Sequence, residues 1–350
     1  MGEYCGDTIE NYVKDESVFK TRNIRILVTI LACCVGLLGF VANPYMLYLL
    51  ISIQIAIIGA LGLSFITGYT GMISLGHGAF IGVGAYAMAI LTTRLGLPFI
   101  VALPISALIT AVIGMFYGLP ALRIKGLYLL MATLAAQVII NFLMVHWKSL
   151  TGGIDGLSVN PASIGAYIFD TEQRYFFLTY ALTIISILAA TNIARSRYGR
   201  AFVAIRDQDL AADVLGVSLF KYKTLSFAIG SFYAGIAGAL LAPYVSLITP
   251  EHFPLHLSIG YLAMIIVGGL GHIMGAIYGA IFITILPELL KILMEGYLVA
   301  LIPDAIRVVP HLNNILFGLI IIGFLIIEPH GLAEIHRRIK KYFKLWPFSY

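Results

Sequence analysis

Long stretches without charged residues alternate with short polar segments along this chain. No Asp, Glu, Lys or Arg occurs between positions 26 and 93, and the same holds for 95–122, 126–147, 175–194, 224–250, 252–287 and 308–327. A bilayer core of about 30 Å requires about 20 predominantly apolar residues per helix. The pattern therefore predicts an all-α polytopic membrane protein with about ten transmembrane helices.

The boundaries of these stretches place the predicted spans at 26–42, 45–65, 74–93, 97–119, 126–147, 175–194, 223–242, 257–271, 273–293 and 313–328. A tail of residues 1–25 precedes this transmembrane domain of 26–328, and a basic tail of 329–350 follows it. The two longest polar connections are 148–174 and 195–223. The polar stretch before position 26 is too long for the usual start of a signal peptide, so we expect no cleavable one.

Composition supports a lipid environment. Hydrophobic residues make up 60% of the chain and charged residues 11%, whereas an ordinary soluble domain has about 25% charged residues. The three cysteines, Cys5, Cys33 and Cys34, give no disulfide framework, because two of them are adjacent within the first span.

The basic residues predict the orientation. With a cytoplasmic N-terminus, the outer side receives only five of the 22 basic residues: Arg94, Lys148, Arg174, Lys291 and Arg307. The positive-inside rule then places both termini in the cytoplasm and requires an even number of spans. The net charge of +5 thus reflects orientation and not nucleic-acid binding. We expect the basic tail at 336–344 to lie at the anionic inner leaflet.

The connection at 195–223 has an amphipathic pattern. Apolar residues fall largely on one helical face, namely Ala201, Ala204, Ile205, Leu210, Ala211, Val214 and Leu215. Charged residues fall largely elsewhere, namely Arg206, Asp207, Asp209 and Asp213. Gly216 follows at a helix C-cap position. Such a helix either docks into a groove on a soluble partner or merely connects two spans, and the pattern leaves both interpretations open.

Two regions combine small residues with glycines four positions apart. The first is GYTGMISLGHGAFIGVG at 68–84, which contains Gly78 and Gly82, and the second contains Gly271, Gly275 and Gly279. This spacing allows two helix backbones to approach closely. Helix packing is the favoured role, and lining of a substrate pathway remains open for some of these positions.

A few polar residues occur within the apolar stretches. Gln54, Gln137 and Asn141 are expected to face other helices or a cavity. His77 lies near the start of a span, where a hydrogen-bonded interior histidine is the commoner role and substrate binding the rarer one.

Several chemistries are excluded by the sequence. The chain contains no Gly-Lys dipeptide and therefore no phosphate-binding loop of the Walker type. It contains neither His-Glu-x-x-His nor cysteines at metal-binding spacing. We therefore expect no catalytic residue, no metal and no cofactor on this chain. Any ATP that drives it must be hydrolysed by another chain.

Six segments together resemble the LivM-type permeases of the branched-chain amino-acid ABC importer family. They are GYTGMISLGHGAF (68–80), LTGGIDGL (150–157), SRYGRAFVAIRDQDLAADVLGV (196–217), GGLGHIMGAIYGA (268–280), LPELLK (286–291) and IEPHGL (327–332). His330, Ala276 and Met72 depart from the usual family pattern. Met72 leaves the substrate open, because related permeases for urea and short amides share much of this pattern.

The resemblance implies the ABC importer permease fold in a bacterial plasma (inner) membrane. It implies import of Leu, Ile or Val with a homologous second permease subunit, two cytoplasmic ATPase subunits and an extracytoplasmic amino-acid-binding protein. The segment Ile205–Gly216 would be the coupling helix, with contacts by Ile205, Arg206, Asp207, Asp209, Ala211, Ala212, Asp213 and Gly216. Packing or pathway residues would be Gly68, Gly71, Ser74, Gly76, His77, Gly78, Gly82, Gly271, Gly275 and Gly279.

Two other classes of function compete with this interpretation. An ion-coupled secondary transporter would carry ionisable residues near the middle of the bilayer, and the charge-free spans argue against it. A membrane-embedded enzyme would need convergent His, Asp, Glu or Ser groups at one depth, and the sequence offers no such set.

Overall fold

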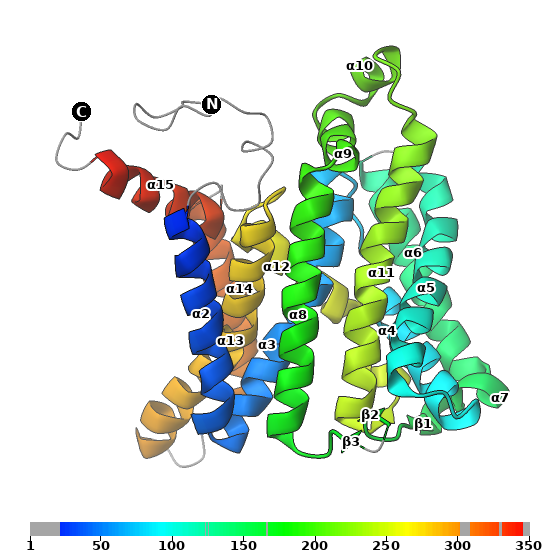
Figure 1. Cartoon of the computed structure of the whole chain (residues 1–350), viewed down its shortest axis with the longest axis vertical. Coiled ribbons are helices and arrows are strands. Elements are labelled where there is room, and N and C mark those ends of the chain that lie inside the picture. The colour runs from blue at the N-terminus through cyan, green and yellow to red at the C-terminus, as the bar shows by residue number, and fades with distance from the viewer. Residues whose placement is uncertain are drawn as a thin grey trace.

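The computed structural model describes residues 22–122, 124, 126–165, 167–301, 309–328 and 331–345, and most of these residues form helices that stand side by side (Figure 1). The predicted tail residues 1–21, together with Arg307 and His330, lie outside the described residues. The longer helices are α2 (Arg22–Val41), α3 (Pro44–Leu63), α4 (His77–Ala89), α5 (Phe99–Gly118), α6 (Leu127–His146), α8 (Glu172–Arg195), α11 (Leu219–Val245), α12 (Leu255–Gly268), α13 (Ile273–Leu301), α14 (Val309–Ile327) and α15 (Leu332–Leu345).

Each predicted span coincides with a helix, but the helices differ in length. Within the described residues, six segments are long and apolar enough to cross a membrane: 44–69, 99–118, 127–146, 172–195, 219–245 and 273–294. A seventh arises if 315–327 and 332–339, bent by 47°, form one span. The all-α polytopic class is therefore confirmed, whereas the number of ten spans remains a prediction.

Two predicted spans contain helices too short to cross a bilayer alone. The span predicted at 74–93 contains α4, which has 13 residues and continues into a π-helical turn, η2 (Ile90–Arg94). The span predicted at 257–271 contains α12, which has 14 residues. At 1.5 Å per residue these helices are roughly 20 Å long.

The segment before α4 is irregular. α3 ends in a π-helical turn, η1 (Ser64–Tyr69), and residues 71–76 have no helical structure. Gly71, with φ +73°, supports the reversal, because only glycine adopts this backbone region without strain. Irregular backbone at membrane depth is tolerated where protein surrounds it, and Thr70, Met72, Ser74 and Gly76 are all buried.

α11 is the central helix of the bundle. It packs most extensively against α5 and α4 and also contacts α3, and most of its length is buried. Small residues make this possible, since Ala234, Gly235, Ala237 and Gly238 are all buried on α11. α5, α6 and α8 bury a smaller share of their length and stand toward the outside of the bundle.

The two ends of the bundle differ in structure (Figure 1). At one end lie α9 (Arg197–Asp207), α10 (Asp209–Val214), the start of α2 and α15. At the other end lie α7 (Lys148–Thr151), η4 (Gly153–Asp155), η5 (Pro250–His252) and two short antiparallel pairs. β1 (Leu157–Ser158) pairs with β4 (Leu247–Ile248), and β2 (Ser163–Ile164) pairs with β3 (Tyr167–Ile168).

Candidate coupling junction and buried polar core

Arg206 of α9 connects this helix to the end of η1. Its Nη1 atom donates a hydrogen bond of 3.1 Å to the carbonyl oxygen of Gly68. A Cβ atom at Gly71 would lie 3.0 Å from Cγ of Arg206. Both glycines of the Gly68–Gly71 segment therefore lie against this one side chain.

The loop between α12 and α13 reaches the same side chain. Gly271 has φ +77°, and a Cβ atom there would overlap the Arg206 guanidinium. A Cβ atom at Gly68 would lie 2.7 Å from the backbone nitrogen of Gly271. Gly68, Gly71, Arg206 and Gly271 form what we call the coupling junction. It joins three segments that are far apart in the sequence.

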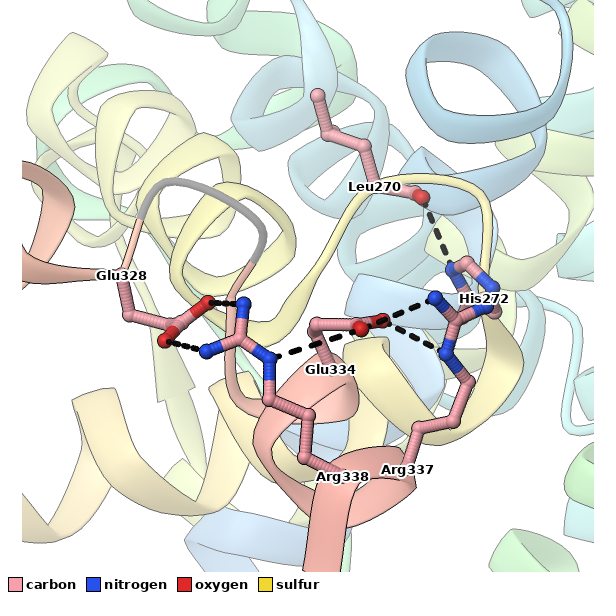
Figure 2. Close-up of polar contacts among 6 residues, drawn as sticks. All are labelled: Leu270, His272, Glu328, Glu334, Arg337 and Arg338. Carbon is pink, nitrogen blue, oxygen red and sulfur yellow. Dashed lines mark hydrogen bonds and ion pairs between the residues drawn. The ribbon is translucent and has the colours of Figure 1, made fainter. Parts of the chain in front are cut away.

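The start of α15 packs against the α12–α13 loop, which carries Gly271 of this junction. Gly331 has φ +79°, and a Cβ atom there would lie 2.6 Å from the backbone nitrogen of Gly269. Figure 2 shows ion pairs within α15 and between α15 and Glu328 at the end of α14. Arg338 pairs with Glu328 through two hydrogen bonds of 3.1 Å, and Arg337 lies 2.8 Å from Glu334.

The predicted amphipathic helix is wrong as a single helix, because the chain breaks at Gln208. This residue is extended, with φ −162° and ψ 103°, and it separates α9 from α10. The apolar face is consequently divided between two environments. Phe202 and Ile205 of α9 are buried in the protein, whereas Leu210 and Val214 of α10 are exposed.

The tip formed by α10 is exposed and apolar. The side chains of Leu210, Val214 and Leu215 are 70%, 88% and 82% exposed. Gly216 ends the helix with φ +86°, in agreement with the predicted C-cap. A hydrogen bond of 2.9 Å from the Val217 amide to the Ala212 carbonyl completes a Schellman motif. We refer to 209–216 as the α10 tip.

An ion pair ties the α10 tip to α11. Nζ of Lys223 lies 3.5 Å from Oδ2 of Asp209, and their side chains are 5% and 19% exposed. The other predicted coupling residues lie around this pair. Ala212 is buried, Ala211 and Asp213 are exposed, and Asp207 forms an ion pair of 3.1 Å with Arg206.

The first turn of α4 is capped by other helices. The first amides of a helix have no partner within it. Here the Gly78 amide donates to Oγ of Ser258 over 2.7 Å, and the Ala79 amide donates to Oε1 of Gln137 over 2.7 Å. Nε2 of His77 lies 2.8 Å from the Gly59 carbonyl oxygen. His77 thus has the hydrogen-bonded interior position that is typical of a buried histidine.

The same polar network continues into α6 and the segment before α12. Nε2 of Gln137 donates to the Phe253 carbonyl over 3.0 Å, and Nδ2 of Asn141 donates to it over 3.2 Å. Oγ of Ser258 donates to Oε1 of Gln137 over 3.0 Å. Gln54 on α3 accepts a hydrogen bond from Thr179 on α8. The polar residues at membrane depth therefore face other helices, as predicted.

The irregular segment before α4 contacts itself and α6. The amide of Gly76 lies 3.4 Å from Oγ of Ser74, and the amide of Leu75 donates to Oγ1 of Thr133 over 3.0 Å. A Cβ atom at Gly76 would lie 3.0 Å from the Thr133 carbonyl oxygen. These contacts fix the backbone immediately before the helix.

The predicted packing glycines contact different partners. A Cβ atom at Gly78 would lie 2.8 Å from Oγ of Ser258, and one at Gly82 would lie 2.9 Å from the Phe253 ring. Cβ atoms at Gly275 and Gly279 would overlap carbonyl oxygens at the end of α12. The second pair therefore closes the hairpin of α12 and α13.

Other close helix approaches involve glycines that sequence reasoning did not select. A Cβ atom at Gly84 would lie 2.6 Å from Cα of Gly235, and one at Gly238 would overlap the Ile81 carbonyl oxygen. The spacing of Gly230, Gly235 and Gly238 on α11 does not follow a simple four-residue repeat. Gly230, Ala234 and Gly238 are nevertheless spaced four apart, and this small-residue spacing could have identified the contact.

The junction and the core differ in chemistry. The core network consists of amides, hydroxyls and one imidazole, which hold helices together without ionic charge. Within the described part of the chain, no group of three or more His, Cys, Asp or Glu side chains could hold a metal ion. At the bundle end that carries α9 and α10, the charged side chain of Arg206 connects elements that are distant in sequence.

Residues 45–325 match the model of the family described as branched-chain amino acid transport system / permease component. The chain belongs to this family. The LivM permease protein of the high-affinity branched-chain amino acid transport system of Escherichia coli (strain K12) is 32% identical over 262 residues, which cover 68% of this chain and 62% of that protein. The chain thus spans less than two thirds of the length of this relative.

Other permeases of the family match more of the chain at lower identity. The autoinducer 2 import system permease protein LsrC of Enterobacter sp. (strain 638) is 26% identical over 350 residues, covering 95% of this chain and 94% of that protein. The probable branched-chain amino acid transport permease protein LivH of Methanocaldococcus jannaschii is 25% identical over 284 residues, covering 79% and 87%. No solved structure matches the chain significantly.

Family membership confirms the resemblance to LivM-type permeases that the six sequence segments indicated. This member of the permease family is a multi-pass membrane protein of the ABC-type permease class. The family includes permeases for more than one kind of solute, as the LsrC relative shows.

Proposed function

We propose that this chain is the permease subunit of an ATP-driven importer that moves Leu, Ile or Val into the cytoplasm. The bundle end that carries α9, α10 and α15 faces the cytoplasm in this proposal. The charge distribution supports that orientation, since Arg197, Arg200, Lys221 and Arg337 belong to that end and basic residues concentrate on the cytoplasmic side of membrane proteins.

The α10 tip is the docking element for a separate ATPase subunit. Its exposed Leu210, Val214 and Leu215 are the observation that carries the proposal. They form an apolar surface on a short helix that extends beyond the bundle (Figure 1), where no lipid would cover it. A short apolar helix of this kind fits a groove on a soluble partner.

The coupling junction transmits movement of the tip to the spans. Arg206 contacts both the end of η1 and the α12–α13 loop, so a displacement of α9 acts on α3 and α13 together. The energy comes from ATP hydrolysis on the partner, and this chain responds mechanically. Coupling of this kind requires a physical connection with two arrangements, and the junction supplies the connection.

The substrate proposal rests on the similarity to LivM, which is 32% identical to this chain. The LsrC relative, which covers more of the chain, and the departure at Met72 make a solute panel necessary. Urea or a short amide is the alternative that the sequence pattern also allows. A second permease subunit and an extracytoplasmic binding protein complete the proposed assembly.

The test is reconstitution into proteoliposomes with the ATPase, second-permease and binding-protein chains encoded beside it. We expect leucine uptake that requires both ATP and the binding protein, with isoleucine and valine competing and urea, acetamide and ribose not competing. Uptake by this chain alone under a proton or sodium gradient would identify a secondary transporter instead.

The docking assignment has its own test. Val214→Glu would place an unpaired charge in the proposed interface, which costs roughly 3 kcal/mol or about 100-fold in ATPase association. The matched control is Ile154→Glu, which alters an apolar side chain 67% exposed at the opposite end of the bundle. Equal ATPase association of both variants would place the docking surface elsewhere.

A further inference from the structure

An apolar groove of about 480 Å³ lies between α13 and α15. Ile281, Ile285 and Leu289 line it from α13, and Leu332, Ile335 and Ile339 line it from α15. The groove opens to the outside of the bundle, and Leu289 and Ile339 at its edge are 49% and 52% exposed. Neither the coupling junction nor the polar core uses this surface.

The length of the groove is comparable to the thickness of one leaflet of a bilayer. It extends along α13 from Tyr278 to Leu289, which is roughly 17 Å of helix. This is about half of a hydrocarbon core of about 30 Å. Because α13 begins at the bundle end that carries α9 and α10, the part of the groove at Tyr278 is the part nearer to that end.

The polar face of α15 has a positive outer surface. The carboxylates of Glu328 and Glu334 are only 11% and 20% exposed, whereas the side chains of Arg338 and Arg337 are 60% and 73% exposed. Figure 2 shows both arginines reaching inward-lying carboxylates. The sequence at 328–344 contains two acidic and five basic residues, so the segment keeps a net positive charge after these pairs form.

We propose that the groove binds one anionic phospholipid, with an acyl chain between α13 and α15 and the phosphate at the basic face of α15. An apolar channel of this length, lined by the helix that also carries the exposed Arg337 and Arg338, fits the two parts of such a lipid. A basic residue near a membrane surface contributes about 1 kcal/mol of attraction to anionic lipid. The aromatic ring of His336, 5.6 Å from that of Tyr278, lies where the two parts meet.

The site has a structural consequence for the loop that it adjoins. α15 begins immediately after Gly331, whose backbone packs on Gly269. A lipid that holds α15 against α13 would therefore also hold the α12–α13 loop in place. The lipid acts on the loop that carries Gly271 of the coupling junction.

The experiment is native mass spectrometry of the purified full-length chain in detergent micelles. Phosphatidylglycerol and phosphatidylcholine with identical acyl chains are added separately, and the retained lipid is counted. We expect one phosphatidylglycerol molecule to be retained in preference to phosphatidylcholine. Inorganic phosphate at millimolar concentration should not displace it, because the acyl chain supplies much of the binding.

Two variants separate the two parts of the site. Arg337→Gln should weaken phosphatidylglycerol retention about fivefold and leave phosphatidylcholine unchanged, and Lys221→Gln, an exposed cation on α11, is its control. Leu289→Trp should weaken retention of both lipids, and Ile322→Trp on α14, at a side chain 58% exposed, is its control. If Leu289→Trp does not fold, Ile339→Ser tests the opposite wall.

Equal retention of the two lipids, or equal losses in variants and controls, would overturn the proposal. A further arm places a photoreactive residue at Ile339 in the assembled transporter. Crosslinks to phosphatidylglycerol support the site, and crosslinks to a second protein chain would assign the groove to a subunit interface. Because lipid retention is measured without transport, its failure is distinguishable from failure of the proposed function.

Discussion

The contact between α4 and α11 and the coupling junction show two ways of joining helices. In the first, Gly84 and Gly238 place backbone directly on backbone, with no ionic group involved. In the second, one long side chain, Arg206, bridges η1 and the α12–α13 loop. Interiors packed at the first kind of contact cannot deform gradually, whereas a bridging side chain can follow a moving partner. The core is therefore expected to be rigid, whereas movement of α9 is expected to be transmitted to the spans at the end of the bundle.

The largest effect on stability is expected at the backbone contact. Gly238→Val would drive its side chain into the Ile81 carbonyl, and overpacking of this kind costs about 3 kcal/mol or more. We expect the variant to lose its thermal unfolding transition in detergent. Gly260→Ala is the control, because nothing lies within 4 Å of a Cβ atom there. An unchanged midpoint in Gly238→Val would show that α4 and α11 do not touch in this way.

A smaller effect is expected at the ion pair beneath the α10 tip, and it should be asymmetric. Asp209→Ala leaves the buried Lys223 ammonium without this carboxylate, which we expect to cost about 2–3 kcal/mol. Lys223→Met should cost less, because the Asp209 carboxylate is more exposed than the lysine and water can solvate it.

The double variant distinguishes pairing from other effects. Asp209→Ala combined with Lys223→Met should be more stable than Asp209→Ala alone, since the stranded charge is gone. Thermal unfolding of the four proteins in detergent measures the coupling energy. Strict additivity would mean that the two side chains do not interact.

Arg206→Ala should affect function more than stability. It removes a charge-assisted hydrogen bond of about 1.5 kcal/mol at a side chain that is 35% exposed. We expect a folded chain that still associates with its ATPase but transports about tenfold more slowly, because movement of α9 no longer reaches η1. The experiment measures both solute uptake by the reconstituted transporter and its association with the ATPase.

Arg200→Ala on the same helix is the control for that variant. Arg200 is exposed, and its Nη1 atom donates a hydrogen bond of 3.1 Å to the Arg195 carbonyl of the preceding helix. Full transport by Arg206→Ala, or equal loss in both variants, would remove Arg206 from the transmission route.

The stretches without charged residues predicted the helices well because lipid imposes a strong and local constraint. Charge-free length placed a helix in every predicted span, and a glycine after the last apolar residue identified Gly216 as the left-handed residue that ends α10. The burial of Gln137 followed from the cost of exposing an amide to lipid. Each of these predictions depends only on neighbouring residues and the solvent.

The features that sequence could not predict depend on distant partners. α4 begins at His77 because Gln137 and Ser258, 58 and 180 residues away from the amides that they cap, satisfy its first turn. The break at Gln208 has no local signal, because glutamine is a good helix former. The bridge from Arg206 to Gly68 spans 138 residues, and arginine on a loop helix is ordinarily solvated.

The smallest effect on the isolated chain, and the sharpest test of the comparison, is expected at the α10 tip. Val214 is 88% exposed, so Val214→Ser should change the free energy of unfolding by less than about 0.5 kcal/mol. In the proposed complex the same side chain is buried, and losing it should weaken ATPase association about tenfold, since burying a valine contributes roughly 1.5 kcal/mol. Titration of the purified ATPase onto reconstituted permease measures this difference. Substitutions in the core should therefore reduce stability and function together, whereas substitutions in the α10 tip should reduce function and leave stability unchanged. If Val214→Ser left ATPase association unchanged, the exposed Val214 side chain would not be part of the docking surface.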